Sequence, residues 1–221
     1  MQVLLFLHRL YFFVILNIRN KKTYKMKKII FLFIISSLIS IKGIGLTLSP
    51  ETEVSILTCA PGNELYSLFG HTAIRINDPR HQIDRVYNYG TFDFSTPHFY
   101  LKYARGLLPY QLTVQKFSHF IYNYQLEERT VYAQTIRLDS LEKQRIFDLL
   151  EENLLPQNRY YLYNFLFDNC TTRSRDILLK SLPDSVAWNM PDVNKNFWNL
   201  LDEYLQASPW VQWGIHTILG Q

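Results

Sequence analysis

The stretch YNFLFDNCTTR, residues Tyr163–Arg173, decides how the rest of this chain is interpreted. An aromatic run rich in strand-forming residues ends at Asp168 and Asn169, and the residues that follow, TTRSRDILLKSL, have the apolar spacing of a helix. Asp and Asn are good helix N-caps, so we expect Cys170 in the first helical turn. The partial positive charge of a helix N-terminus favours a thiolate, which makes Cys170 a candidate nucleophile.

A cysteine nucleophile needs a base, and we predict that His71 supplies it. Residues 71–76, HTAIRI, alternate between two faces as a strand does. An imidazole can take the thiol proton and leave a thiolate that attacks a carbonyl carbon. It usually needs a third polar group to fix its orientation. Asn88, on the expected neighbouring strand, is the preferred candidate for this group, with Asp84 and Asp93 as alternatives.

Other polar groups near this pair are candidates for contacting a substrate. Backbone N–H groups at the helix start, around Asn169, are predicted to bind the oxyanion of the reaction. Tyr66 and Ser67 lie in the loop before the histidine and are expected to line a cleft. Arg173 is a further candidate for substrate binding. The alternative for Arg173 is an ion pair with an acidic neighbour such as Glu64 or Asp176.

The two cysteines allow an interpretation without catalysis. An even number of cysteines in an exported protein favours a disulfide, and a Cys59–Cys170 bridge would leave no nucleophile. His71 would then only satisfy a backbone group near a turn. On this interpretation the protein is a non-enzymatic periplasmic accessory or binding domain.

The basic net charge of +4 comes from the N-terminal segment. Residues 1–48 contain eight Lys or Arg residues and no Asp or Glu. Of the 23 basic and 19 acidic residues in the whole chain, 15 basic and all 19 acidic residues therefore lie in the remainder, whose net charge is −4. This mildly acidic body gives no reason to expect nucleic-acid binding.

The same N-terminal segment predicts export. Met26 and two lysines precede the apolar run IIFLFIISSLISI, the pattern of a secretory signal peptide. The run is too short for a membrane span, which takes about 20 residues. We therefore expect a signal peptide over residues 26–48 and a periplasmic protein.

Both ends of the chain leave alternatives open. Residues 1–25 hold another apolar run, interpreted either as a mis-assigned extension before a start at Met26 or as a membrane anchor. With such an anchor the protein would be a membrane-associated scaffold. The C-terminal residues 209–221 are apolar without a polar tail, so they either pack as a final element or mark a truncated chain.

Residues 49–221 are expected to form a single α+β domain. No repeat or low-complexity linker divides this part of the sequence. Strands are expected at 53–59, 71–76, 84–89 (closing at Gly90), 129–138 and 160–167, and helices at 96–106, 114–126, 139–155, 171–182 and 194–206.

Three segments resemble the Lnb N-terminal periplasmic domain family, a group of exported proteins common in Bacteroidetes-type bacteria. They are TCAPGNELYSLFGHTAIRI (58–76), YNYGTFDFSTPHFYLKYARG (87–106) and RYYLYNFLFDNCTTRSRDIL (159–178), and the resemblance covers roughly residues 50–215. Members of this family often continue beyond the point where this sequence stops.

The order of the histidine and the cysteine also resembles that of permuted papain-like proteins of the NlpC type and of lecithin retinol acyltransferase relatives. This resemblance rests on GHTAIRI and on the Asn-Cys pair. It implies a papain-like antiparallel sheet packed against helices, with Cys170 as the nucleophile and His71 as the base.

No metal is expected, because the histidines other than His71 lack metal-ligand spacing. No cofactor is expected either, since no phosphate-binding glycine loop is present, and the absence of a G-x-S-x-G motif gives no support for a serine nucleophile. The sequence thus predicts a periplasmic cysteine-dependent hydrolase or acyltransferase. Its substrate would be an amide or ester in an unknown peptide, lipid or glycan of the cell envelope.

Overall fold

The computed structural model describes residues 45–182 and 194–219. The predictions for residues 1–25 and for most of the signal peptide lie outside these residues. The strands and helices follow one another in this order: β1 (Glu53–Cys59), η1 (Leu65–Ser67), β2 (His71–Asp78), β3 (Ile83–Phe92), α3 (Phe99–Ala104), β4 (Pro109–Lys116), α4 (Phe117–Leu126), β5 (Val131–Thr135), α5 (Ser140–Leu154), β6 (Tyr160–Leu162), α6 (Cys170–Ser181), α7 (Phe197–Leu205) and α8 (Pro209–Leu219).

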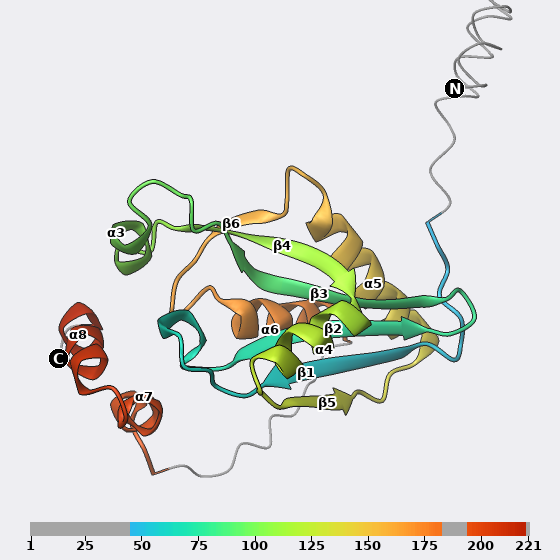
Figure 1. Cartoon of the computed structure of the whole chain (residues 1–221). Helices are drawn as coiled ribbons and strands as arrows, with labels where there is room; N and C mark the ends of the chain where they lie inside the picture. Colours follow the sequence, from blue (N-terminus) through green and yellow to red (C-terminus); the bar gives the residue numbers. More distant parts are fainter. Residues whose placement is uncertain (1–44, 183–193, 220–221) are drawn as a thin grey trace, which may run out of the picture. The chain divides into compact units, whose positions relative to one another are not determined.

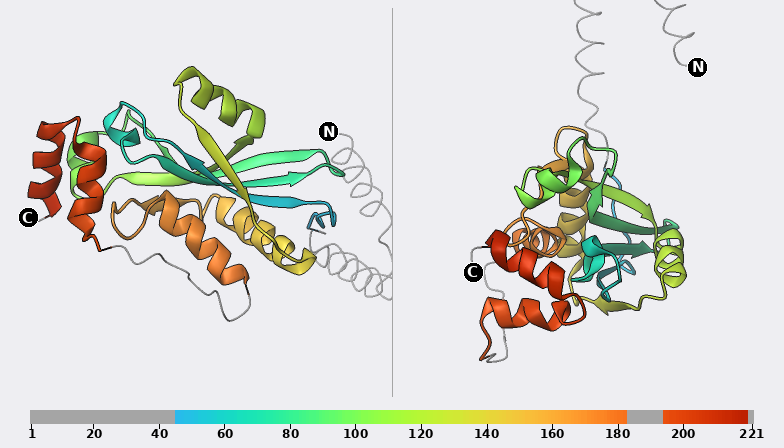
Figure 2. Two further views of the ribbon diagram at one scale, coloured as in Figure 1. Left: turned by 90° about the horizontal axis from the view of Figure 1, so that it is seen from below. Right: turned by 60° about the vertical axis from the view of Figure 1, so that its left-hand side comes forward.

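The six strands form one antiparallel sheet in the order β5-β1-β2-β3-β4-β6 (Figure 1). Helix α4 lies on one face of the sheet, and α5 and α6 lie on the other (Figure 2, left). This arrangement confirms the predicted α+β class with an antiparallel sheet packed against helices. Among the described residues, no helix is both long and apolar enough to cross a membrane.

Two cores form because alternate residues of each strand point to opposite faces. In β2, Ile74 and Ile76 join the larger core beneath α5 and α6, whereas Ala73 joins a smaller core beneath α4. The predicted alternation of this strand is therefore confirmed. Ile177 brings α6 into the larger core, which fixes the helix against β2 and sets the position of Cys170 at its first turn.

Several element boundaries differ from the sequence-based predictions. Strand β4 was not expected, and the helix predicted from residue 114 begins at Phe117. Tyr110 and Leu112 alternate into the core as strand residues do, and the helical spacing starts only after them. Strand β3 also continues through Gly90 to Phe92, with an irregular register, instead of closing at the glycine.

The helix termini follow local chemistry that the sequence indicates well. Asp139 and Glu142 form the predicted capping box of α5, and Asn169 caps α6. The C-terminal segment contains α8, which contacts α7 through Asp202. That carboxylate accepts hydrogen bonds from Gln212 Nε2 at 2.6 Å and His216 Nε2 at 2.8 Å.

At the hairpin end of β2, a buried carboxylate holds the start of the domain. Asp78 is fully buried and accepts hydrogen bonds from the backbone N–H and hydroxyl of Ser49, both at 2.8 Å, and from His81 Nδ1 at 2.8 Å. Desolvation raises the pKa of Asp78, but the hydrogen bonds from His81 and Ser49 outweigh it and hold the pKa well below the ordinary 3.8.

We predict that Asp78→Asn destabilises the domain at pH 7 by roughly 1.5–3 kcal/mol, the usual contribution of a hydrogen bond to a charged group. Because folding depresses the pKa, this stabilisation is present above the ordinary value of 3.8 and is lost as the pH falls below it. Urea denaturation should thus show a difference between wild type and variant at pH 7 that shrinks in acid. Asp148→Asn, on the exposed side of α5, is the control. Equal stability of wild type and Asp78→Asn at pH 7 would contradict the prediction.

Candidate active site

Cys170 is the first residue of α6 and is half-buried. The Asn169 side chain caps the helix, because its Oδ1 accepts hydrogen bonds from the N–H groups of Thr171 and Thr172, both at 3.0 Å. Its Nδ2 donates to the carbonyl of Phe165 at 2.8 Å. The predicted N-cap is therefore confirmed, and both ends of the Asn169 amide are engaged in holding the helix start.

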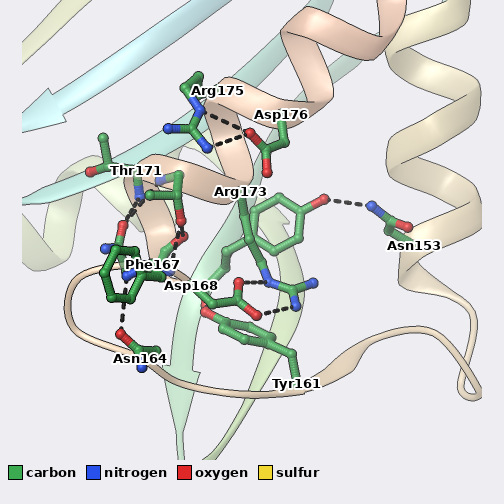
Figure 3. Close-up of polar contacts among 12 residues, drawn as sticks. Asn153, Tyr161, Asn164, Phe167, Asp168, Thr171, Arg173, Arg175 and Asp176 are labelled. Atoms are coloured by element: carbon green, nitrogen blue, oxygen red, sulfur yellow. Dashed lines mark hydrogen bonds and ion pairs between the residues drawn. The ribbon is translucent and has the colours of Figure 1, made fainter. Parts of the chain in front are cut away.

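The loop before Cys170 is held by Asn164 and Asp168. Their backbones exchange two hydrogen bonds of 2.9 and 3.0 Å. The Asn164 side chain also accepts from the N–H groups of Leu166 and Phe167, both at 3.0 Å (Figure 3). Because of this turn, only the first three residues of the aromatic run, Tyr160–Leu162, form a strand, β6. The predicted strand over 160–167 is therefore too long.

Arg173 points back toward this loop. Its guanidinium donates two hydrogen bonds to Asp168, at 2.6 and 2.8 Å, and lies 3.8 Å above the ring of Tyr161 (Figure 3). Arg173 therefore forms the ion pair that the sequence allowed as an alternative, with Asp168 in place of Glu64 or Asp176. It does not line the cleft that contains Cys170.

His71 begins β2, and its ring is oriented by Asn88 of β3. His71 Nε2 lies 2.8 Å from Asn88 Oδ1, and the same oxygen accepts the Gly90 N–H at 2.7 Å. Because a carbonyl oxygen can only accept, Nε2 carries the hydrogen and Nδ1 of the neutral ring is the proton acceptor. The other two candidates face elsewhere: Asp84 binds Arg75 at 2.7 and 2.9 Å, and Asp93 binds Ser95 at 2.7 and 2.8 Å.

His71, at the start of β2, and Cys170, at the start of α6, line the same cleft. Desolvation of the sulfur raises the Cys170 pKa, but hydrogen bonding to His71, the charge of the imidazole and the N–H of Thr72 lower it more strongly, so the pKa falls from 9.0 to about 7. The lowered pKa increases the share of Cys170 that is thiolate at neutral pH.

Cys59 has the opposite environment. It is buried in the core beneath α4, directly across the β1–β2 pair from His71. Desolvation raises its pKa to about 11, so it stays a thiol at neutral pH. Both cysteines are free in the structure, without the disulfide considered from the sequence.

A cleft of about 870 Å³ connects these groups. Its lining includes His71, Asn88 and Cys170, and also Tyr66 and Ser67 from η1. The Asn169 side chain caps the N–H groups of Thr171 and Thr172. Within the described parts of the chain, no hydrogen-bond acceptor faces the first helical N–H, that of Cys170. Among the same residues, no group of three His, Cys, Asp or Glu side chains could hold a metal ion.

Sequence reasoning missed Gly90, which makes room for the imidazole. A Cβ atom added to this glycine would lie 2.4 Å from His71 Cε1, 3.1 Å from Nδ1 and 3.2 Å from Asn88 Oδ1. A glycine inside a strand commonly marks such a close approach, and this signal was available in the motif YNYG.

We predict that Gly90→Ala displaces the His71 ring and slows alkylation of Cys170 by iodoacetamide at pH 7. If the thiol pKa returns to its ordinary 9.0, the thiolate fraction drops to about one in a hundred and the rate falls by up to ~50-fold. Peptide mass spectrometry would follow Cys170 alone. Gly214→Ala, where an added Cβ meets nothing within 4 Å, is the control. An unchanged rate in folded Gly90→Ala would refute the prediction.

The comparisons with known proteins agree with the resemblance noted in the sequence. Residues 47–202 match the family model described as the Lnb N-terminal periplasmic domain. No curated protein and no solved structure matched the chain. The family match extends over most of the sequence and contains His71, Asn88 and Cys170. The chain is therefore a periplasmic protein and belongs to the Lnb N-terminal periplasmic domain family.

Proposed function

We propose that this protein is a cysteine-dependent hydrolase or acyltransferase that acts on an amide or ester in the cell envelope. The observation that carries the proposal is the position of Cys170 at a helix N-terminus, in the same cleft as an imidazole that Asn88 orients. This imidazole lowers the Cys170 pKa. A thiol buried only for packing has its pKa raised, as that of Cys59 is. Perturbed pKa values of this kind are characteristic of functional sites.

In the proposed reaction, His71 Nδ1 takes the thiol proton and the Cys170 sulfur attacks the carbonyl carbon of the substrate. The carbonyl π-electrons move to oxygen, and the Cys170 N–H, together with the positive helix end, stabilises this oxyanion. When the bond to the leaving group breaks, the His71 imidazolium protonates that group, and a thioester remains on Cys170. Water, or the nucleophile of a second substrate, then takes the acyl group and restores the thiol.

The predicted residues divide between direct and supporting roles in this mechanism. Asn88 holds the His71 tautomer with Nδ1 as the acceptor. Asn169 contributes to oxyanion binding by capping the neighbouring N–H groups and leaving that of Cys170 available. Arg173 fixes the loop that precedes the nucleophile through Asp168. Tyr66 and Ser67 contact the substrate from the cleft wall.

We further propose that the fold is a permuted papain-like fold of the NlpC type. Support comes from the chain order, with a histidine that begins a strand of an antiparallel sheet and a cysteine that begins a helix packed on that sheet.

The cleft also favours an apolar group on the substrate. A side slot of about 150 Å³ opens beside it and is lined mainly by aromatic residues. Tyr66, Tyr103 and Tyr110 line both the slot and the main cleft, so a group bound in the slot would lie along the path to Cys170. Aromatic side chains offer large apolar contact surfaces to such a group.

We predict that an activated ester, p-nitrophenyl acetate, acylates Cys170 and that His71→Ala slows this step by about 100-fold or more, the usual range for loss of a general base. Intact-mass and peptide mass spectrometry would detect the acetyl adduct, and Cys170→Ala should form none at this peptide. His119→Ala, an exposed histidine on α4, serves as the control. Equal acylation in wild type and His71→Ala would argue against the enzymatic proposal.

The choice of Asn88 over the two aspartates can be tested in the same assay. Asn88→Ala should slow acylation about tenfold, the equivalent of roughly 1.4 kcal/mol and within the range for one hydrogen bond. Asp93→Asn should leave the rate unchanged, because the Asp93 side chain, among the residues that the structure describes, forms hydrogen bonds to Ser95 alone. A loss with Asp93→Asn and none with Asn88→Ala would reverse the assignment.

A further inference from the structure

The residues that follow the base and the nucleophile contact each other. Thr72 comes directly after His71, and Thr171 comes directly after Cys170. Their hydroxyl oxygens lie 2.9 Å apart, so one hydroxyl donates to the other across 99 residues of chain. The hydrogen bond joins the start of β2 to the start of α6, the two ends that the proposed chemistry requires to stay together.

Both threonines also approach the sulfur. The hydroxyl of Thr171 lies 4.0 Å from Cys170 Sγ, and the backbone N–H of Thr72 is among the groups that stabilise its ionised form. The backbone of Thr171 is itself fixed, because its N–H donates to Asn169 at 3.0 Å. The Thr171 hydroxyl can therefore turn toward either the sulfur or Thr72 by rotation of its C–O bond alone.

We propose that Thr72 and Thr171 are positioning residues that form a hydroxyl relay, which holds the nucleophile beside the base and directs a hydroxyl hydrogen at the ionised sulfur. In the thiol state, S–H donates to His71 and the Thr171 hydroxyl donates to Thr72. In the thiolate state, the thiol proton is on His71, the Thr72 hydroxyl donates to Thr171, and the Thr171 hydroxyl donates to the sulfur. No proton leaves either threonine. This inference rests on the proposed function of Cys170 and His71.

The Thr72 and Thr171 hydroxyls together should stabilise the thiolate more strongly than the Thr171 hydroxyl alone, because each hydrogen bond polarises the next. Without the Thr171 hydroxyl, however, that of Thr72 has no route to the sulfur. The relay thus predicts that loss of the Thr171 hydroxyl raises the Cys170 pKa more than loss of the Thr72 hydroxyl does. Simple packing of α6 on β2 predicts no such order. Valine keeps the shape of threonine without the hydroxyl, and serine keeps the hydroxyl without the methyl group.

The test is the pH dependence of Cys170 alkylation by iodoacetamide, followed by peptide mass spectrometry, with the thermal midpoint of each variant measured in parallel. Thr171→Val should raise the alkylation midpoint by about 0.5–1 pH unit, the equivalent of one ordinary hydrogen bond. Thr72→Val should raise it less, and the double variant no more than Thr171→Val. Thr171→Ser should keep the wild-type midpoint.

Thr135→Val is a matched control, because Thr135 makes a similar hydroxyl pair with Ser55, at 3.1 Å, between β1 and β5. It should leave the alkylation midpoint unchanged. A wild-type midpoint near 9 would overturn the proposed function, and this inference with it. A wild-type midpoint near 7 that Thr171→Val does not move would overturn the relay alone. Equal shifts in Thr171→Val and Thr171→Ser, or a loss of thermal stability without a shift, would also overturn it.

Discussion

The central interaction in this protein is the contact between the Cys170 sulfur at the start of α6 and the His71 imidazole at the start of β2. Taking a thiolate out of water is unfavourable, and the effect of desolvation at this site is to raise the pKa. The net lowering of the Cys170 pKa therefore depends on how close the imidazole, the Thr72 N–H and the helix N-terminus lie to the sulfur. Small displacements of either element would restore an ordinary cysteine.

The rest of the domain maintains that convergence. Ile177 packs with Ile74 and Ile76 of β2 in one core, so the helix axis and the strand are fixed together. Asn164 and the Asp168–Arg173 ion pair hold the loop before Cys170 in place. Because the Asp168 carboxylate is more than a third exposed, the charge attraction is screened by water. The ion pair therefore orients the loop mainly through the geometry of its two parallel hydrogen bonds. On the other strand, Gly90 allows the backbone to approach the imidazole closely enough for Asn88 to bind it. Each of these contacts is local, yet all of them position the same two side chains.

The parts of this arrangement that sequence analysis predicted are those that depend on neighbouring residues. The N-cap at Asn169, the capping box of α5 and the alternation of β2 all follow from spacing within a few positions. The pairing of His71 with Asn88 could be expected once two adjacent strands were recognised, and the structure brings these residues to 2.8 Å. The family match covers residues 47–202, a range that contains all of these segments.

The parts that were missed depend on distant contacts. Strand β4 pairs with both β3 and β6, and those partners stabilise it although the following residues have helical spacing. Arg173 is a plausible anion-binding residue in the sequence, but the turn at Asn164 places Asp168 beside it. The Thr72–Thr171 contact spans 99 residues and has no local signature. Such features become visible only when the chain has been folded around them.

The most direct test of this account is an NMR titration of the full chain labelled with ¹³C at the cysteine Cβ positions. We expect the Cys170 signal to titrate with a midpoint near 7, while the signal of Cys59, whose pKa is raised to about 11, does not change through neutral pH. A Cys170 signal that titrates near 9, or that has the chemical shift of a disulfide, would contradict it.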